Sequence, residues 1–142
     1  MDKIILSTSA VLIDDKVKFS CVTRDNPSIQ IDYNKPIGDG DGYTSLELFL
    51  ISLSTCVATS VITIIRKMNR TIKSLKISAS GERKTEHPTC FSEVVIHFDI
   101  VTDAEAKEID RSITLSEETF CPVWAMVKNN VKVNIRYSLS KL

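Results

Sequence analysis

Residues 44–56 read TSLELFLISLSTC, and this stretch decides the fold because it begins a long apolar helix. Thr44 and Glu47 form a capping box, in which each side chain pairs with the backbone N–H of the other residue at a helix N-terminus. The apolar run predicts a helix that continues to about Asn69 and carries Cys56 near its middle. Basic residues complement the negative end of the helix dipole: Arg66, Lys67 and Arg70.

The predicted helix is close to the length of a membrane span, so its environment has to be decided. It carries Glu47 and six hydroxyl side chains: Ser52, Ser54, Thr55, Thr59, Ser60 and Thr63. The sequence on both sides is typical of soluble strands and loops. A helix that is apolar on nearly every side is also typical of the centre of a globular core. We therefore expect a buried central helix and no membrane association.

Strand patterns flank this helix. Before it, the runs 4–13, 17–23 and 28–33 are separated by turn sequences, and such short connections favour antiparallel neighbours. After it, apolar and polar residues alternate in 72–80 and 91–101. The loop 34–43 delivers the chain into the helix, and its glycine-rich part, Gly38–Gly42, is expected to be a flexible turn.

Two further helices and a last strand complete the chain. Thr102 with Glu105 predicts a second capped helix, and Cys121-Pro122 predicts the start of a third. The run 131–137 alternates as a final strand. The order βββ-α-ββ-α-α-β, with no repeat and no linker, predicts a single α+β domain over 1–142 with a largely antiparallel sheet packed on the long helix.

Composition excludes some classes of protein. Eighteen acidic and eighteen basic residues cancel, which removes the charge expected of a nucleic-acid binder or a polybasic membrane anchor. The N-terminal residues do not match a secretory signal, so we expect a cytoplasmic protein with reduced thiols. The four cysteines include no CxxC pair, and we expect no metal site.

Two of the cysteines are candidates for chemistry. Pro122 suits the first position of a helix and places Cys121 at the N-cap, where free N–H groups and the helix dipole are expected to lower the pKa of its thiol. For Cys56 taken alone, the favoured interpretation is a small buried core residue. The 65 positions between them say nothing about contact, which a disulfide would require.

Two stretches, 44–56 and 117–123 (EETFCPV), resemble the two cysteine motifs of the OsmC/Ohr family. The resemblance covers nearly the whole chain, with both motifs in the family's element order. It implies an OsmC-like fold and an intertwined homodimer with sites at the subunit interface, which would bury the apolar helix.

The resemblance also implies an activity built on a pair of thiols. Cys56 would attack a peroxide as thiolate and become a sulfenic acid, and Cys121 would condense with it to a disulfide. An external dithiol would reset the pair, with no bound cofactor.

Two further site residues follow from the family, each with an alternative. In its hydroperoxide-resistance branch a catalytic glutamate lies ten positions before the first cysteine, directly after a proline. Leu46 and Ser45 hold those places here, and Glu47, one residue later, is a candidate for catalysis or for helix capping alone. Arg24 is the candidate activating cation, with an exposed turn residue as the alternative.

Lys16 or Lys18 could fill the place of the activating cation instead of Arg24.

Together, the two cysteines and the family resemblance predict a thiol-dependent peroxidase that reduces organic hydroperoxides or hydrogen peroxide in oxidative-stress defence. The alternative is an OsmC-like module without enzymatic activity, which binds a small molecule or acts as a redox-regulated interaction protein.

Overall fold

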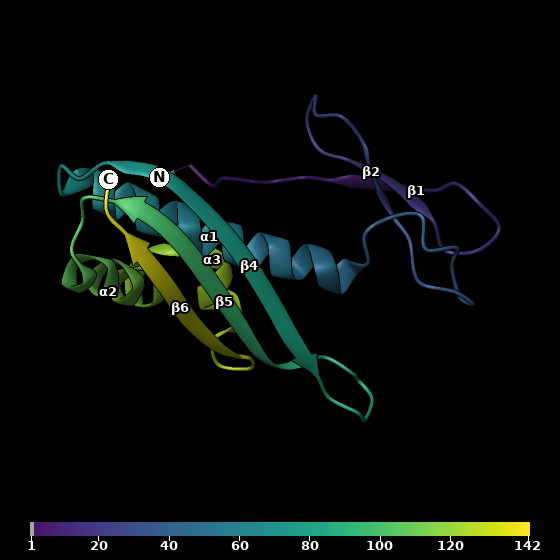
Figure 1. The fold of residues 1–142 in the computed structure, drawn as a ribbon. Helices are drawn as coiled ribbons and strands as arrows, with labels where there is room; N and C mark the ends of the chain where they lie inside the picture. Colours follow the sequence, from purple (N-terminus) through teal and green to yellow (C-terminus); the bar gives the residue numbers. More distant parts are fainter. Residues whose placement is uncertain (1) are drawn as a thin grey trace. The chain divides into compact units, whose positions relative to one another are not determined.

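The computed structural model describes residues 2–142, which form two compact units, residues 2–49 and Leu50–Leu142. The order βββ-α-ββ-α-α-β is confirmed, with one π-helical segment added between the last two helices. Figure 1 shows the elements in sequence colours. The expectation of a single domain stays a prediction, and each unit is described by itself.

The first unit contains an antiparallel sheet in the order β1-β2-β3. These strands are β1 (Ser9–Leu12), β2 (Phe19–Val22) and β3 (Ile29–Ile31). All three are shorter than the sequence runs predict. The run 4–13 supplies a strand only from Ser9, where pairing with Val22 begins, because a ladder needs a partner along its whole length.

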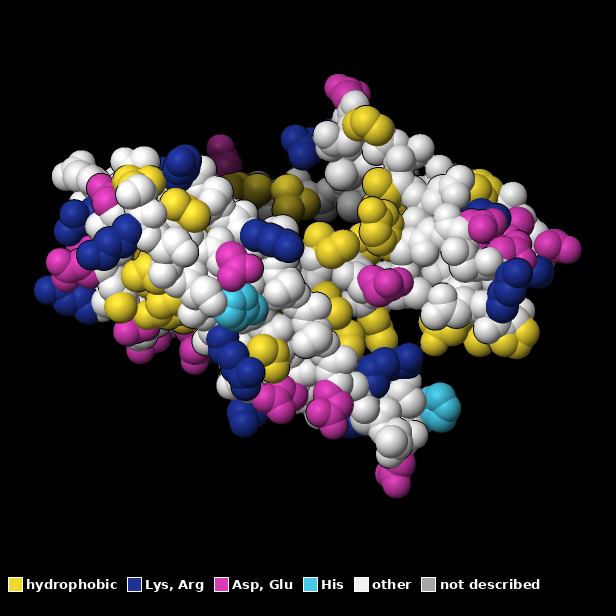
Figure 2. Space-filling view, in the orientation of Figure 1, with side chains coloured by type: hydrophobic (Ala, Val, Ile, Leu, Met, Phe, Trp, Pro, Cys, Tyr) yellow, Lys and Arg dark blue, Asp and Glu magenta, His cyan; other side chains and the backbone are white. Residues whose placement is uncertain are grey.

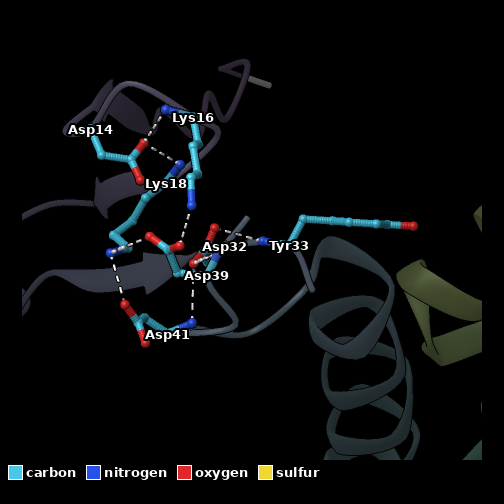
Figure 3. A network of polar contacts seen from close by, with 7 residues as sticks. All are labelled: Asp14, Lys16, Lys18, Asp32, Tyr33, Asp39 and Asp41. Carbon is cyan, nitrogen blue, oxygen red and sulfur yellow. Dashed lines mark hydrogen bonds and ion pairs between the residues drawn. The ribbon is translucent and has the colours of Figure 1, made fainter. Parts of the chain in front are cut away.

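A network of hydrogen bonds and ion pairs stabilises the loop that follows β3 (Figure 3). The Asp32 carboxylate is 2% exposed and accepts hydrogen bonds from three backbone N–H groups, those of Tyr33 (2.8 Å), Asp39 (3.1 Å) and Asp41 (3.0 Å). A side chain at Gly38 would collide with Asp32 and with the Tyr33 carbonyl. These hydrogen bonds and the close approach at Gly38 define the shape of the turn, and its flexibility stays a prediction.

The long helix α1 (Ser45–Lys67) has the predicted start and nearly the predicted end. The Thr44 N–H donates to Glu47 Oε1 (2.9 Å) and the Glu47 N–H donates to Thr44 Oγ1 (3.2 Å), so the capping box is confirmed. Among residues 2–142, α1 alone is long and apolar enough to cross a membrane, and 33% of its most apolar stretch is buried within the chain.

The second unit is built on the sheet β4-β5-β6. Its strands are β4 (Ile72–Arg83), β5 (Phe91–Thr102) and β6 (Lys132–Ser140). β4 and β5 are antiparallel, whereas β5 and β6 are parallel, so the two sheets together are largely antiparallel as expected. Alternate residues of β5 and one face of α1 supply most of the core: Val94, Ile96, Phe98, Ile100, Leu53, Val57, Val61 and Ile65.

The second helix begins later than the sequence predicts. Thr102 remains in β5, where its hydroxyl donates to the Thr71 carbonyl (2.6 Å). Helix α2 (Ala106–Leu115) has Glu105 as its N-cap, and Glu105 and Glu108 form the capping box. The expected cap at Thr102 is therefore wrong, because the sheet already uses that hydroxyl.

A π-helical turn, η1 (Ser116–Phe120), joins α2 to α3 (Pro122–Val127). Such turns occur mostly as single insertions, often beside functional sites. The second helix therefore changes type at Ser116, and the chain stays helical as far as Phe120.

We expect Asp32 to contribute a pH-dependent part of stability. Hydrogen bonds from backbone N–H groups, that of Asp41 first, lower the pKa of Asp32 below its ordinary value of 3.8. A lowered pKa stabilises the fold above that value, and this contribution is lost as the pH falls through the lower pKa. In thermal melts from pH 6 downward, Asp32→Asn should melt below the wild type at pH 6, with the difference shrinking in acid. A difference that does not change with pH would contradict this role.

Candidate functional site

Cys121 is the N-cap of α3, as the sequence predicts. Pro122 occupies the first turn, and the Trp124 N–H donates to Cys121 Sγ at 3.5 Å. The Val123 N–H also faces this sulfur. The Cys121 side chain is 2% exposed, and the neighbouring Trp124 is also buried.

Burial raises the pKa of the Cys121 thiol to about 11, so the expected lowering is wrong. The two backbone N–H groups do favour its thiolate, but removing the sulfur from water has the larger effect. A hydrogen bond with Cys56 and the charge of that cysteine raise the pKa further. Cys121 is therefore held as a neutral thiol at physiological pH.

The proximity of Cys56 to Cys121 is the central feature of the site, because the Cys56 side chain is among the groups that raise the pKa of Cys121. It brings the middle of α1 close to the start of α3, across 65 residues of sequence. Neither sulfur is in a disulfide, and Cys56 is half-buried where Cys121 is buried. Two adjacent thiols of different exposure can take different protonation states, which is the arrangement that a nucleophile and its partner need.

Glu47 lies in the first turn of α1 and is exposed. Its pKa is lowered because it accepts hydrogen bonds from the backbone and side chain of Thr44. This capping geometry accounts for its conformation. A catalytic role for Glu47 stays a prediction.

The three candidate cations all belong to the first unit. Arg24 is exposed in the turn after β2, with a positive φ of 54°. The Lys18 ammonium donates to Asp41 (2.9 Å), and that of Lys16 pairs with Asp39 (Figure 3). Both lysines are therefore engaged within the loop network. Arg24 stays the predicted activating cation.

One cluster of carboxylates in the described chain is close enough to hold a metal ion, namely Asp32, Asp39 and Asp41. These carboxylates already have partners. Asp32 accepts hydrogen bonds from backbone N–H groups, and Asp39 and Asp41 form ion pairs with lysines. On the face drawn in Figure 2, acidic and basic side chains are interspersed. The site chemistry therefore centres on the two thiols.

A cleft of about 440 Å³ lies along α1 beyond Cys56. Its walls combine hydroxyl groups and apolar side chains: Thr59, Ser60, Thr63, Ile64, Lys67, Met68, Leu115 and Phe120. Ser60 is one turn from Cys56 and donates to its carbonyl (3.3 Å), while Phe120 directly precedes Cys121. Neither cysteine lines the cleft itself, but each is close in sequence to a residue that does.

Similarity to known proteins identifies the family of this chain. The sequence model described as OsmC-like protein matches residues 38–136, which contain both cysteines. The chain belongs to the OsmC-like family. The Escherichia coli protein YhfA is 28% identical over 96 residues, which cover 66% of this chain and 71% of that protein.

Solved structures of OsmC-like and other proteins share the fold. A hypothetical protein from Aquifex aeolicus has a TM-score of 0.86 at 26% identity, with 99% of each chain covered. The OsmC-like protein from Mycoplasma pneumoniae has a TM-score of 0.78 at 21% identity, covering 100% of this chain and 99% of that one. The organic hydroperoxide resistance protein OsmC from Legionella pneumophila has a TM-score of 0.75 at 14% identity, covering 97% and 99%.

Sequence reasoning found the cysteines of this OsmC-like protein but missed the cleft. Its hydroxyls recur at Thr59, Ser60 and Thr63, a spacing that places them on neighbouring faces of one helix. That spacing was the available signal. No signal in the sequence indicates that Leu115 and Phe120 also line the cleft. Their place there depends on how the π-helical turn packs against α1.

Proposed function

We propose that this OsmC-like protein is a thiol-dependent peroxidase that reduces organic hydroperoxides, and also hydrogen peroxide, in oxidative-stress defence. The observation that carries the proposal is that Cys56 lies close enough to the buried Cys121 to raise the pKa of its thiol. Solved relatives named organic hydroperoxide resistance proteins, from Legionella pneumophila and Elizabethkingia anophelis, support a peroxide-related role.

The first step takes place at Cys56, the more accessible sulfur of the two. Its thiolate attacks one peroxide oxygen, the O–O bond breaks, and the electron pair leaves on the other oxygen. That alkoxide takes up a proton and departs as an alcohol, or as water when the substrate is hydrogen peroxide. Cys56 is then a sulfenic acid.

The second step uses Cys121. Its sulfur attacks the Cys56 sulfur, the S–O bond breaks, and the departing hydroxide combines with the thiol proton as water. An external dithiol reduces the resulting disulfide by thiol–disulfide exchange and becomes a cyclic disulfide itself. This cycle balances with peroxide and dithiol alone, so the protein needs no bound cofactor or metal.

The cleft along α1, which begins about one turn from Cys56, supports an organic substrate over a small inorganic one. Its apolar walls include Ile64, Met68 and Phe120, and the last of these is 53% exposed. An organic group lying there would bury apolar surface, which favours binding by about 25 cal/mol per Å². Hydrogen peroxide gains nothing from such walls. We therefore expect a lower KM for a bulky organic hydroperoxide.

The test is peroxide consumption followed by stopped flow, with cumene hydroperoxide and hydrogen peroxide and with dithiothreitol as the dithiol. Cys56→Ser should lose essentially all turnover because the nucleophile is gone. Cys121→Ser should complete about one turnover and then stop, with a sulfenic acid that dimedone traps on Cys56. The matched control is Cys90→Ser, which should retain wild-type rates.

No turnover with either peroxide by the folded wild type would contradict the peroxidase. The cleft would then favour the second candidate, a module that binds a small apolar molecule without chemistry. Binding that is unchanged in Cys56→Ser would identify that alternative.

We also propose that the protein acts as a cytoplasmic homodimer. Large apolar side chains are fully open to solvent in the single chain, including Ile4 (89% exposed), Ile5 (80%) and Leu6 (90%). Contiguous apolar surface of this kind marks interaction sites. A second copy of the chain, as the family resemblance implies, would cover it.

Light scattering coupled to size exclusion should therefore give twice the chain mass of 15.9 kDa. Ile5→Asp should weaken the dimer at least tenfold, because burying one isoleucine contributes about 1.5–3 kcal/mol. Lys107→Ala, at a charged side chain that is 81% exposed on α2, is the control and should leave the dimer intact. A monomeric wild type would contradict the proposal.

A further inference from the structure

The π-helical turn η1 sets the position of Cys121. The Cys121 N–H donates to the Ser116 carbonyl at 2.9 Å, a bond that reaches five residues back where an α-helix reaches four. The next bond of this ladder would join the Glu117 carbonyl to the N–H of residue 122. Residue 122 is a proline and has no N–H, so the Glu117 carbonyl is left without the donor that the ladder would supply.

Lys128 supplies a donor to this carbonyl. The residue is the C-cap of α3, and its ammonium reaches back to the Glu117 carbonyl at 3.4 Å. Within residues 2–142 the Lys128 ammonium forms no ion pair, so its contact is with the main chain and not with the Glu117 carboxylate. The side chain therefore connects the end of α3 to the turn that precedes Cys121.

Two serines hold the inner side of the same turn. Ser112 and Ser116 are both fully buried. The Ser116 hydroxyl donates to the Ser112 carbonyl and the Ser112 hydroxyl donates to the Ile109 carbonyl, both at 2.7 Å. Hydroxyls that bond back to the preceding turn often bend a helix. The inner side of the turn is thus fixed in the core, whereas Lys128 holds its outer side at the surface.

The turn has an alternative register. In an α-helical register the Cys121 N–H would donate to the Glu117 carbonyl instead of the Ser116 carbonyl. Cys121 would then rotate by about 100° about the helix axis, the angle of one residue. Its side chain would leave the present position, where it is 2% exposed and its sulfur accepts the Trp124 N–H at 3.5 Å. The advantage of that register is a partner for the Glu117 carbonyl, and the Lys128 ammonium removes this advantage.

We propose that Lys128 is a positioning residue, whose hydrogen bond to the Glu117 carbonyl favours the π register of η1 and so keeps the Cys121 thiol in its buried position at the start of α3. The inference rests on the proposed function for the use of Cys121 as the resolving thiol. A rotated Cys121 would attack the Cys56 sulfenic acid more slowly. Because the acceptor is a main-chain carbonyl, an arginine can replace Lys128, and the Glu117 side chain has no part.

The test measures the rate of Cys121 alkylation by iodoacetamide in the reduced full-length protein, without peroxide, with mass spectrometry reading each cysteine peptide separately. Lys128→Met removes the donor and keeps most of the side-chain length, whereas Lys128→Arg keeps a donor. Glu117→Ala removes the side chain and leaves the carbonyl. Lys107→Met, at a lysine that is 81% exposed on α2, is the matched control.

Cys121 should react about fivefold faster in Lys128→Met, the factor that corresponds to a net hydrogen-bond contribution of about 1 kcal/mol. The other three variants should react at the wild-type rate. Cys21 and Cys90 report on general loosening of the fold, and their rates should stay unchanged in every variant. Equal Cys121 rates in the wild type and Lys128→Met would overturn the positioning role. A rise that Cys21 and Cys90 share, or that Lys128→Arg fails to reverse, would overturn it as well.

A second measurement connects the position of Cys121 to the resolving step. With one equivalent of cumene hydroperoxide and with dimedone present, trapping of the Cys56 sulfenic acid should rise in Lys128→Met and return to the wild-type level in Lys128→Arg. Unchanged trapping would overturn the role in resolution. A wild type that consumes no peroxide, with the predicted alkylation rates, would overturn the peroxidase proposal and leave the positioning of Cys121 by Lys128 intact.

Discussion

The burial of one face of α1 together with the inward face of β5 is the constraint on which the rest of the second unit depends. Leu53, Val57, Val61 and Ile65 are fully buried, and each such side chain contributes about 1.5–3 kcal/mol. These residues fix the rotation of α1 about its axis. That rotation leaves Cys56, next to Val57, at the edge of the core, where it meets the start of α3. The position of Cys56 in the site is thus a consequence of the rotation of α1 that core packing fixes.

Local signals in the sequence predicted the parts of the fold that depend on neighbouring residues. The Thr44 and Glu47 cap is correct because both hydrogen bonds close within one turn of chain. The same pattern at Thr102 and Glu105 failed. There the Thr102 hydroxyl donates to the carbonyl of Thr71, a residue 31 positions away, and the next glutamate pair forms the cap instead. Two local patterns of equal strength were separated only by tertiary structure.

In the site, too, the local features were predictable from the sequence and the features that depend on tertiary packing were not. The N-cap position of Cys121 was predictable from Pro122, but the direction of its pKa was not. The backbone N–H groups that favour a thiolate are local, whereas the burial that outweighs them comes from packing. The contact between Cys56 and Cys121 also has no signal in their spacing. Only the resemblance to a known family joined them before the structure did.

The most direct test of the central claim is to map the disulfide that forms when the reduced protein is treated with one equivalent of cumene hydroperoxide. Peptide mapping by mass spectrometry would follow, with loss of two hydrogens as the signature. The account predicts one bond, between Cys56 and Cys121, with Cys21 and Cys90 still free. Oxidation that leaves Cys56 and Cys121 unlinked, or that links either to Cys21 or Cys90, would contradict it.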